Sequence, residues 1–166
     1  MKFNWMPRMG YLAGFLVSGG LISCALYQQY YEYQNPCPLC ILQRLVYIAL
    51  MTVFLIAALH GPCRTGAIIY STLLVAISLT GAGIATRHVW LQHLPKDKVP
   101  ECGPGLAYML DRFPFFDAFA KIFRGSGECA DASWKIVGLS IAEWSLAWFV
   151  LLGAFAVFIA VAARKR

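Results

Sequence analysis

Residues 37–59 read CPLCILQRLVYIALMTVFLIAAL. From Ile41 to Leu59 it is almost wholly apolar, with Arg44 as its single charge, and it is long enough to cross a lipid bilayer as a helix. A helix is the expected form because it satisfies its own backbone hydrogen bonds, which lipid cannot do. The stretch therefore predicts a membrane-spanning helix with two cysteines at its start.

Three further stretches of similar length are nearly free of charge, at residues 11–29, 67–86 and 145–163. Over the whole chain 60% of the residues are hydrophobic and 13% are charged, whereas ordinary soluble domains carry about 25% charged residues. A length of 166 residues suits one unit. We expect an all-α membrane protein, a bundle of four transmembrane helices, in which residues 1–166 form a single integral membrane domain.

The charges predict which side of the membrane each end faces. Every acidic residue falls in two connections, at about residues 30–40 and 87–144. Because cytoplasmic segments are enriched in Lys and Arg, we expect both termini to be cytoplasmic. The net charge of +6 then reflects topology, and we expect no nucleic-acid partner. The basic residues behind this prediction are Lys2, Arg8, Arg64, Arg164, Lys165 and Arg166.

The first span has an alternative interpretation as a secretory signal, because residues 21–24 (LISC) resemble the box at which bacterial lipoproteins are cleaved. Its length favours a membrane span, and Gly10, Gly14 and Ser18 form a stripe of small residues suited to close helix packing. Cys24 is then expected to be a buried, inert core residue. Cys63 lies in the short inner connection, where a reduced thiol without a role is expected.

The long outer connection contains Cys102 and Cys129. Between them the sequence predicts a short amphipathic helix that lies on the membrane surface, although a loop helix packed against the bundle fits the pattern equally well. Gly125 is a plausible end for that helix, and it would leave Cys129 on a glycine-rich hinge. The apolar arc of the helix is Phe115, Phe116, Phe119, Ile122 and Phe123, and the polar arc is Asp117, Lys121 and Arg124.

The Cys37-Pro-Leu-Cys40 spacing points to redox chemistry. A bridge across two residues closes a small ring with little gain in stability, and this spacing recurs in thiol-disulfide exchange sites. The helix that starts near Pro38 favours a thiolate at Cys40 through its N-terminal dipole. Arg44 is one turn further on and can stabilise that thiolate or an oxygen of a bound oxidant. An arginine this close to hydrocarbon is costly and commonly functional.

The second cysteine pair leaves more alternatives open. A bridge between Cys102 and Cys129 could simply staple the loop, by roughly 3 kcal/mol. Two pairs of cysteines also suit a tetrahedral zinc site, but the second pair lacks the short spacing of such sites, and zinc would not explain Arg44. We therefore expect no metal.

Taken together, these features resemble the DsbB family, the bacterial inner-membrane proteins of disulfide bond formation. The likeness covers the four spans in order, the CPLCILQR block at residues 37–44, the cysteine pair of the long loop and the block GSGECA at residues 125–130 followed by Trp134. Gln43 differs from family members that carry an acidic residue before the arginine.

This resemblance implies a protein-dithiol:quinone oxidoreductase whose redox cysteines are periplasmic. A disulfide between Cys102 and Cys129 would be attacked by a reduced periplasmic thiol oxidase of the DsbA type, with the mixed disulfide at Cys102. Released Cys129 would attack the Cys37–Cys40 bridge at Cys37, and Cys40 would face a ubiquinone or menaquinone held by Arg44. His88 lies where similar proteins place a histidine near the quinone ring, although an interfacial histidine is an equally good interpretation.

Two other classes share some of these features. Enzymes similar to vitamin K epoxide reductase also combine a loop cysteine pair with a C-x-x-C, but in them the loop pair comes first in the chain. Tetraspan scaffolds such as tetraspanins carry a Cys-Cys-Gly in the large loop, which is absent here. Such a scaffold would also have no need of Arg44 next to a dithiol, so the DsbB-like interpretation is favoured over both classes. The sequence leaves open the kind of quinone, the partner paralogue, the resting disulfide pairing and the oligomeric state.

Overall fold

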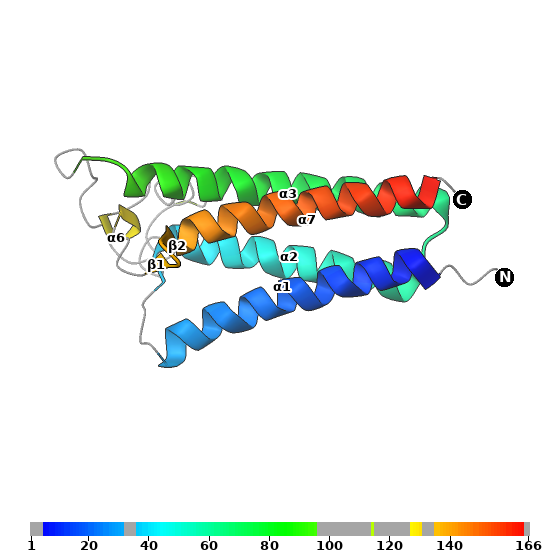
Figure 1. The fold of residues 1–166 in the computed structure, drawn as a ribbon, viewed down its shortest axis with the longest axis horizontal. Helices are drawn as coiled ribbons and strands as arrows, with labels where there is room; N and C mark the ends of the chain where they lie inside the picture. Colours follow the sequence, from blue (N-terminus) through cyan, green and yellow to red (C-terminus); the bar gives the residue numbers. More distant parts are fainter. Residues whose placement is uncertain (1–4, 32–35, 96–113, 115–126, 131–134, 165–166) are drawn as a thin grey trace.

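The computed structural model describes residues 5–31, 36–95, 114, 127–130 and 135–164. Four long helices run side by side along the molecule (Figure 1). They are α1 (Trp5–Tyr31), α2 (Pro38–His60), α3 (Arg64–Gln92) and α7 (Ile141–Arg164). Each is long and apolar enough to cross a membrane, so the predicted four-helix transmembrane bundle is confirmed. The predicted interfacial helix at residues 115–124 lies outside the described residues.

All four helices extend beyond the predicted spans at both ends. The apolar runs mark the part that suits hydrocarbon, whereas a helix continues through the interface with polar residues such as Arg64 and Gln92. This extension matters for the site. Residues 87–92 belong to α3 although the sequence analysis assigned them to the outer connection, so His88 projects from a rigid helix.

The helices pack as two pairs, α3 with α7 and α1 with α2, and α2 also packs against α3 (Figure 1). Toward the end where α2 begins, α1 diverges from α7 (Figure 1). Both termini and the connection between α2 and α3 lie at the opposite end (Figure 1). The bundle therefore has one end that carries the chain termini and one that carries the start of α2.

Glycines allow the closest helix contacts. A Cβ atom added to Gly14 would lie 2.5 Å from the Phe54 ring, and one added to Gly81 would lie 2.5 Å from the Phe149 ring. Ser18 is also fully buried, so the predicted small-residue stripe of α1 does face a helix partner. Cys24 was predicted to be buried on the same helix, but it is exposed, because it lies away from the stripe that packs.

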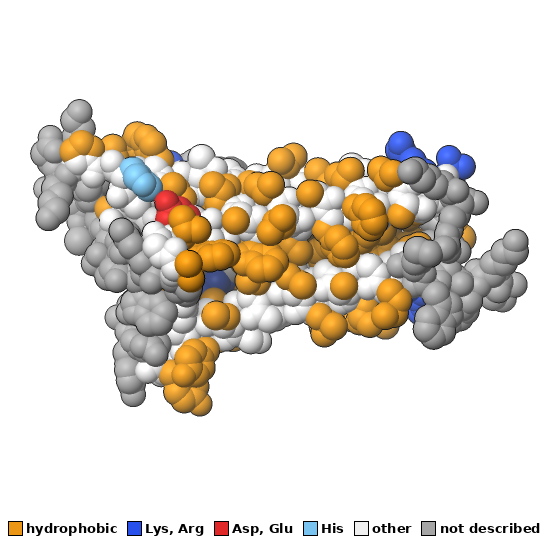
Figure 2. All heavy atoms as spheres, in the orientation of Figure 1, with side chains coloured by type: hydrophobic (Ala, Val, Ile, Leu, Met, Phe, Trp, Pro, Cys, Tyr) orange, Lys and Arg blue, Asp and Glu red, His pale blue; other side chains and the backbone are white. Residues whose placement is uncertain are grey.

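Large apolar side chains cover the outer surface along the length of the bundle (Figure 2). In water such a surface would favour aggregation, but in a bilayer it is the expected contact with lipid tails. Tyr27, Tyr30 and Tyr31 are exposed at the end of α1, as expected for an interfacial aromatic belt. Most of the Lys and Arg side chains visible in Figure 2 lie at the end that carries the termini.

A small hairpin precedes α7 and was not predicted from the sequence. Strand β1 (Lys135–Ile136) pairs antiparallel with β2 (Leu139–Ser140), and the turn residues Val137 and Gly138 both have positive φ, 54° and 83°. Such turns usually carry Asn-Gly or Asp-Gly, so Val-Gly gives little signal. Ser140 then begins α7 through a capping box: Glu143 N donates to Ser140 Oγ at 3.3 Å, and Ser140 N donates to Glu143 Oε2 at 2.6 Å.

Candidate thiol redox site

The first cysteine of the pair is built into the start of α2. Cys37 has an extended backbone and is the N-cap of the helix, and Pro38 occupies the first turn, where its missing N–H costs nothing. Cys40 N donates to Cys37 Sγ at 3.4 Å, so the sulfur takes the place of a usual capping oxygen. The CPLC sequence therefore sets both the helix start and the position of its two sulfurs.

The two sulfurs lie close enough to react with each other. Cys37 and Cys40 are free thiols whose Sγ atoms are 3.1 Å apart, with Cys37 donating to Cys40. Forming a disulfide requires an approach to about 2.05 Å. Cys37 is buried, whereas Cys40 is partly exposed. The two residues of the pair therefore differ in exposure.

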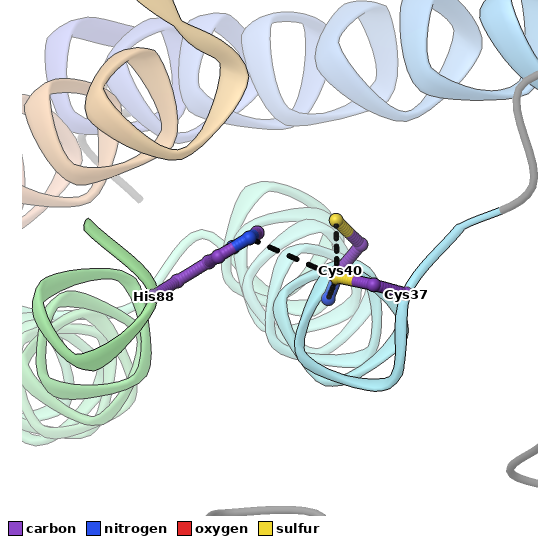
Figure 3. A group of neighbouring side chains, drawn as sticks. All are labelled: Cys37, Cys40 and His88. Atoms are coloured by element: carbon purple, nitrogen blue, oxygen red, sulfur yellow. Dashed lines mark hydrogen bonds between the residues drawn. The ribbon is translucent and has the colours of Figure 1, made fainter. Parts of the chain in front are cut away.

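His88 reaches the pair from α3 (Figure 3). Its Nε2 lies 3.7 Å from Cys37 Sγ, and its Nδ1 lies 3.2 Å from Gln43 Nε2. His88 and Gln43 are each only 3% exposed, so the ring is fixed between α2 and α3. When Gln43 donates to Nδ1, the proton of the neutral ring is on Nε2, the nitrogen nearer to Cys37 Sγ.

Cys129 completes the cluster from a third element. It lies on the short helix α6 (Gly127–Ala130) and is fully buried against Cys37, Leu39 and neighbouring apolar side chains. Its side chain hydrogen-bonds to Cys37, and its backbone hydrogen-bonds to His88. The outer loop therefore delivers its second cysteine directly to the first cysteine of the CPLC motif.

The surroundings of Cys37 act on its acidity in opposite directions. The hydrogen bond with Cys129 lowers the pKa of Cys37, but the hydrogen bond to Cys40, burial and the neighbouring Cys40 charge together raise this pKa to about 12. Cys37 is accordingly protonated at neutral pH. It donates its hydrogen to Cys40, and this hydrogen bond favours negative charge on the Cys40 sulfur.

Arg44 lies one helical turn beyond Cys40, but its hydrogen bonds go to α1. Its NH1 donates to Gln29 Oε1, and its NH2 donates to Ala25 O at 3.0 Å. These bonds tie the guanidinium of Arg44 to α1. Arg44 is partly buried there, and it links the redox helix to the end of α1.

The structure brings together four of the six residues predicted for the site: Cys37, Cys40, Cys129 and His88. Arg44 is adjacent to this cluster through α2, and Cys102 lies outside the described residues. The sequence analysis gave Gln43 no role, although it holds the ring of His88. The sequence did contain a signal for such a role: Gln43 is a polar residue on the same face of α2 as buried Leu39, Tyr47 and Leu50.

Comparison with known proteins places this geometry in a family. The family model described as disulfide bond formation protein DsbB matches residues 7–159. The chain belongs to the DsbB family. Disulfide bond formation protein B of Nitrosococcus oceani is 46% identical over 151 residues, covering 91% of this chain and 89% of that protein. The protein of the same name from Xanthomonas euvesicatoria is 40% identical over 164 residues, with 98% and 95% covered.

DsbB membership implies a disulfide oxidoreductase role, and the four long apolar helices make the chain a multi-pass membrane protein. The Methylococcus capsulatus protein of the same name is 47% identical over 148 residues, covering 89% of this chain and 90% of that protein. Because these matches include nearly the whole chain, they extend over the described helices and the connections between them.

Proposed function

We propose that this DsbB-family protein is a protein-dithiol:quinone oxidoreductase: it reoxidises a periplasmic thiol oxidase of the DsbA type and passes the electrons to membrane quinone. The observation that carries the proposal is the contact between Cys129 and Cys37, in which the loop cysteine meets the CPLC pair. A structural staple would have no need to bury a loop cysteine against a second, separate dithiol. The chain acts as one integral membrane domain.

The exchange begins outside the bundle. A thiolate of the soluble partner attacks the Cys102–Cys129 disulfide at Cys102, and Cys129 leaves as a thiolate. Cys129 then attacks Cys37, and the Cys37–Cys40 bond breaks with its electron pair going to Cys40. When the partner's second thiolate attacks the mixed disulfide, the partner leaves oxidised. The buried contact of Cys129 with Cys37 supports this target, because attack needs the two sulfurs to meet directly.

Cys40 is suited to be the leaving sulfur. It lies in the first turn of α2, where the helix dipole favours negative charge, and it accepts the hydrogen bond from Cys37. Its partial exposure, in contrast to buried Cys37, supports access for an electron acceptor. The Cys102 thiolate then attacks Cys129, so that the Cys102–Cys129 disulfide re-forms and Cys37 leaves as a thiolate. A quinone beside the pair would accept two electrons and two protons as Cys37 and Cys40 re-form their disulfide.

The residues around Cys40 fit a quinone. A quinone supplies a two-electron acceptor with carbonyl oxygens that need hydrogen-bond donors. Arg44 can hold such an oxygen, because its bonds to α1 use two of the five N–H donors of a guanidinium. His88, fixed by Gln43, is a second polar group beside the pair.

The proposed orientation puts both termini in the cytoplasm and the CPLC end in the periplasm of a bacterial inner membrane. Arg8, Arg64 and Arg164 all lie at the ends of helices on the terminal side, and this clustering supports the orientation (Figures 1 and 2). Glu143 lies at the start of α7, on the opposite side.

The deciding experiment follows the purified protein in detergent with a reduced DsbA-type partner, with and without added quinone. Partner thiols and quinone absorbance are recorded together. Stoichiometric loss of both is expected. Thiol loss without quinone reduction would contradict quinone as the acceptor, and a lack of reaction with either would contradict the proposed function. A Cys102→Ser variant should block partner oxidation while the Cys37–Cys40 pair still reacts with quinone.

A further inference from the structure

The reduced site has a second chemical property that thiol exchange does not require. We propose that Cys37, Cys40 and His88 form a redox-gated binding site for a thiophilic divalent cation of the Zn²⁺ class, which binds the dithiol form and is excluded by the disulfide. The three donor atoms, two Sγ and one imidazole nitrogen, all lie within 4.8 Å of one another (Figure 3).

This donor set differs from the one considered from the sequence. From the sequence alone, a zinc site would have to combine the four cysteines of the two outer connections. The structure instead joins the CPLC pair to a histidine of α3, which is 51 positions from Cys37 along the chain. Two thiolates and one imidazole are a common zinc donor set, and three protein ligands leave a fourth position open for water or another ligand.

The distances suit a tetrahedral ion. With Zn–S bonds of about 2.3 Å and Zn–N bonds of about 2.0 Å, tetrahedral ligands lie about 3.8 Å apart for two sulfurs and about 3.5 Å apart for sulfur and nitrogen. The Sγ atoms are 3.1 Å apart here, and the Cys37 Sγ to His88 Nε2 distance is 3.7 Å. Small rotations of the cysteine side chains would bring all three donors into place.

Charge balance also favours the complex. Both thiols lose their protons on binding, so two protons are released, and the two thiolates neutralise the divalent ion. A complex without net charge is suited to a site lined by Leu39, Ile84 and Leu91, where an uncompensated charge would be costly. A disulfide between Cys37 and Cys40 removes both anionic ligands, and this is the basis of the redox gate.

Gln43 supplies the outer support that metal-binding histidines usually have. A histidine that binds metal through Nε2 must carry its proton on Nδ1 and donate it to an acceptor. Gln43 contacts Nδ1 at 3.2 Å, and half a turn of its amide presents the carbonyl oxygen to that proton. The same buried side chain therefore serves the ring with or without an ion.

The test uses the full chain in detergent with Cys24 and Cys63 replaced by Ala, because both are exposed thiols outside the cluster. The protein is reduced with a phosphine and titrated with Cd²⁺, followed by thiolate-to-cadmium absorption and by competition with Zn²⁺. One ion per chain is expected in the reduced form, and no tight binding is expected after oxidation. Equal binding by both forms would overturn the proposal.

Two histidines near the end of α3, His88 and His93, provide a test variant and its control. His88→Ala should weaken binding by at least about tenfold, and Gln43→Leu by about tenfold or more, as for other outer-shell changes. His93→Ala is the control, because His93 is exposed and, among the described residues, its ring bonds to its own helix at Val89 O. Circular dichroism checks folding, and Cys40→Ser provides a second ligand variant.

Binding that survives His88→Ala and Cys40→Ser but disappears in Cys102→Ser/Cys129→Ser would assign the ion to the loop cysteines and overturn the proposal. A consequence for activity rests on the proposed function: the ion should slow partner reoxidation until a chelator removes it. The binding measurement needs neither partner nor quinone. Its failure can therefore be told apart from failure of the proposed function.

Discussion

At the scale of single residues, the site depends on an asymmetry between two neighbouring sulfurs. Cys37 is the N-cap, is buried, and touches both Cys129 and His88, whereas Cys40 is in the first turn and partly exposed. Sequence alone indicated that Cys40 was the better thiolate, from its place on the helix. The structure also explains why Cys37 stays protonated: its hydrogen bond to Cys40 and its burial raise its pKa.

This asymmetry predicts the pH dependence of the reduced protein. The pKa of Cys37 is raised from 9.0 to about 12, so folding favours its protonated form. Its contribution to stability is fully present below pH 9 and is lost as the pH rises toward 12. Alkylation of Cys37, followed by mass spectrometry across this range, should rise only at the alkaline end.

Cys129→Ala sharpens this test. It removes the hydrogen bond that lowers the pKa of Cys37, so the alkylation curve of Cys37 should move to still higher pH. A curve that moves to lower pH, or a Cys37 that reacts fully near neutral pH in the unmodified chain, would contradict the assignment of Cys37 as the protonated sulfur.

Arg44 gives a second prediction at this scale. Arg44→Ala should raise the quinone concentration needed for half-maximal turnover by about tenfold or more, since a charge-assisted hydrogen bond contributes about 1.5–3 kcal/mol. Thiol exchange with the soluble partner, measured in a single turnover without quinone, should be unchanged. Arg44→Lys keeps the charge and should be intermediate, because lysine lacks the planar fork. An unaltered quinone dependence in Arg44→Ala would remove Arg44 from the acceptor site.

At the scale of elements, the contact between α3 and α7 depends on the absence of a side chain at Gly81. A Cβ atom there would lie 2.5 Å from the Phe149 ring. Gly81→Ala should therefore lower the free energy of unfolding by about 1–3 kcal/mol, as overpacking commonly does. Thermal unfolding in detergent measures the effect.

The same helix offers the control for this change. Gly83 is exposed, and a Cβ atom added there has no neighbour within 4 Å. Gly83→Ala should leave the melting temperature unchanged or raise it, because alanine is the better helix former. If both substitutions lowered stability equally, the cost would belong to the helix backbone and not to the contact with Phe149.

The elements also show what could be predicted from the sequence. The spans, the small-residue stripe and the meeting of Cys37 with Cys40 follow from composition and short spacing, so local reasoning found them. The contact of Gln43 with His88 could not be found in this way, because it depends on how α2 and α3 are rotated against each other. The Val137–Gly138 turn was missed since valine rarely adopts positive φ.

At the scale of the whole molecule, the two ends of the bundle differ in chemistry, and this difference predicts how it lies in the membrane. Cys63 is exposed at the start of α3, beside the chain termini, and Tyr31 is exposed at the opposite end (Figure 1). A membrane-impermeant maleimide added to intact spheroplasts should leave Cys63 unlabelled. It should label a Tyr31→Cys substitution placed in a chain that carries Cys63→Ser.

Inverted membrane vesicles should give the reverse pattern, because the same maleimide then meets the cytoplasmic face. Cys24 provides an internal reference: it is exposed on the side of α1 within the apolar span, so in both preparations a polar reagent should reach it poorly. Labelling of Cys63 in intact spheroplasts would contradict the proposed orientation and would place the chain termini in the periplasm. The CPLC pair would then face the reducing cytoplasm, and reoxidation of a periplasmic partner would be excluded.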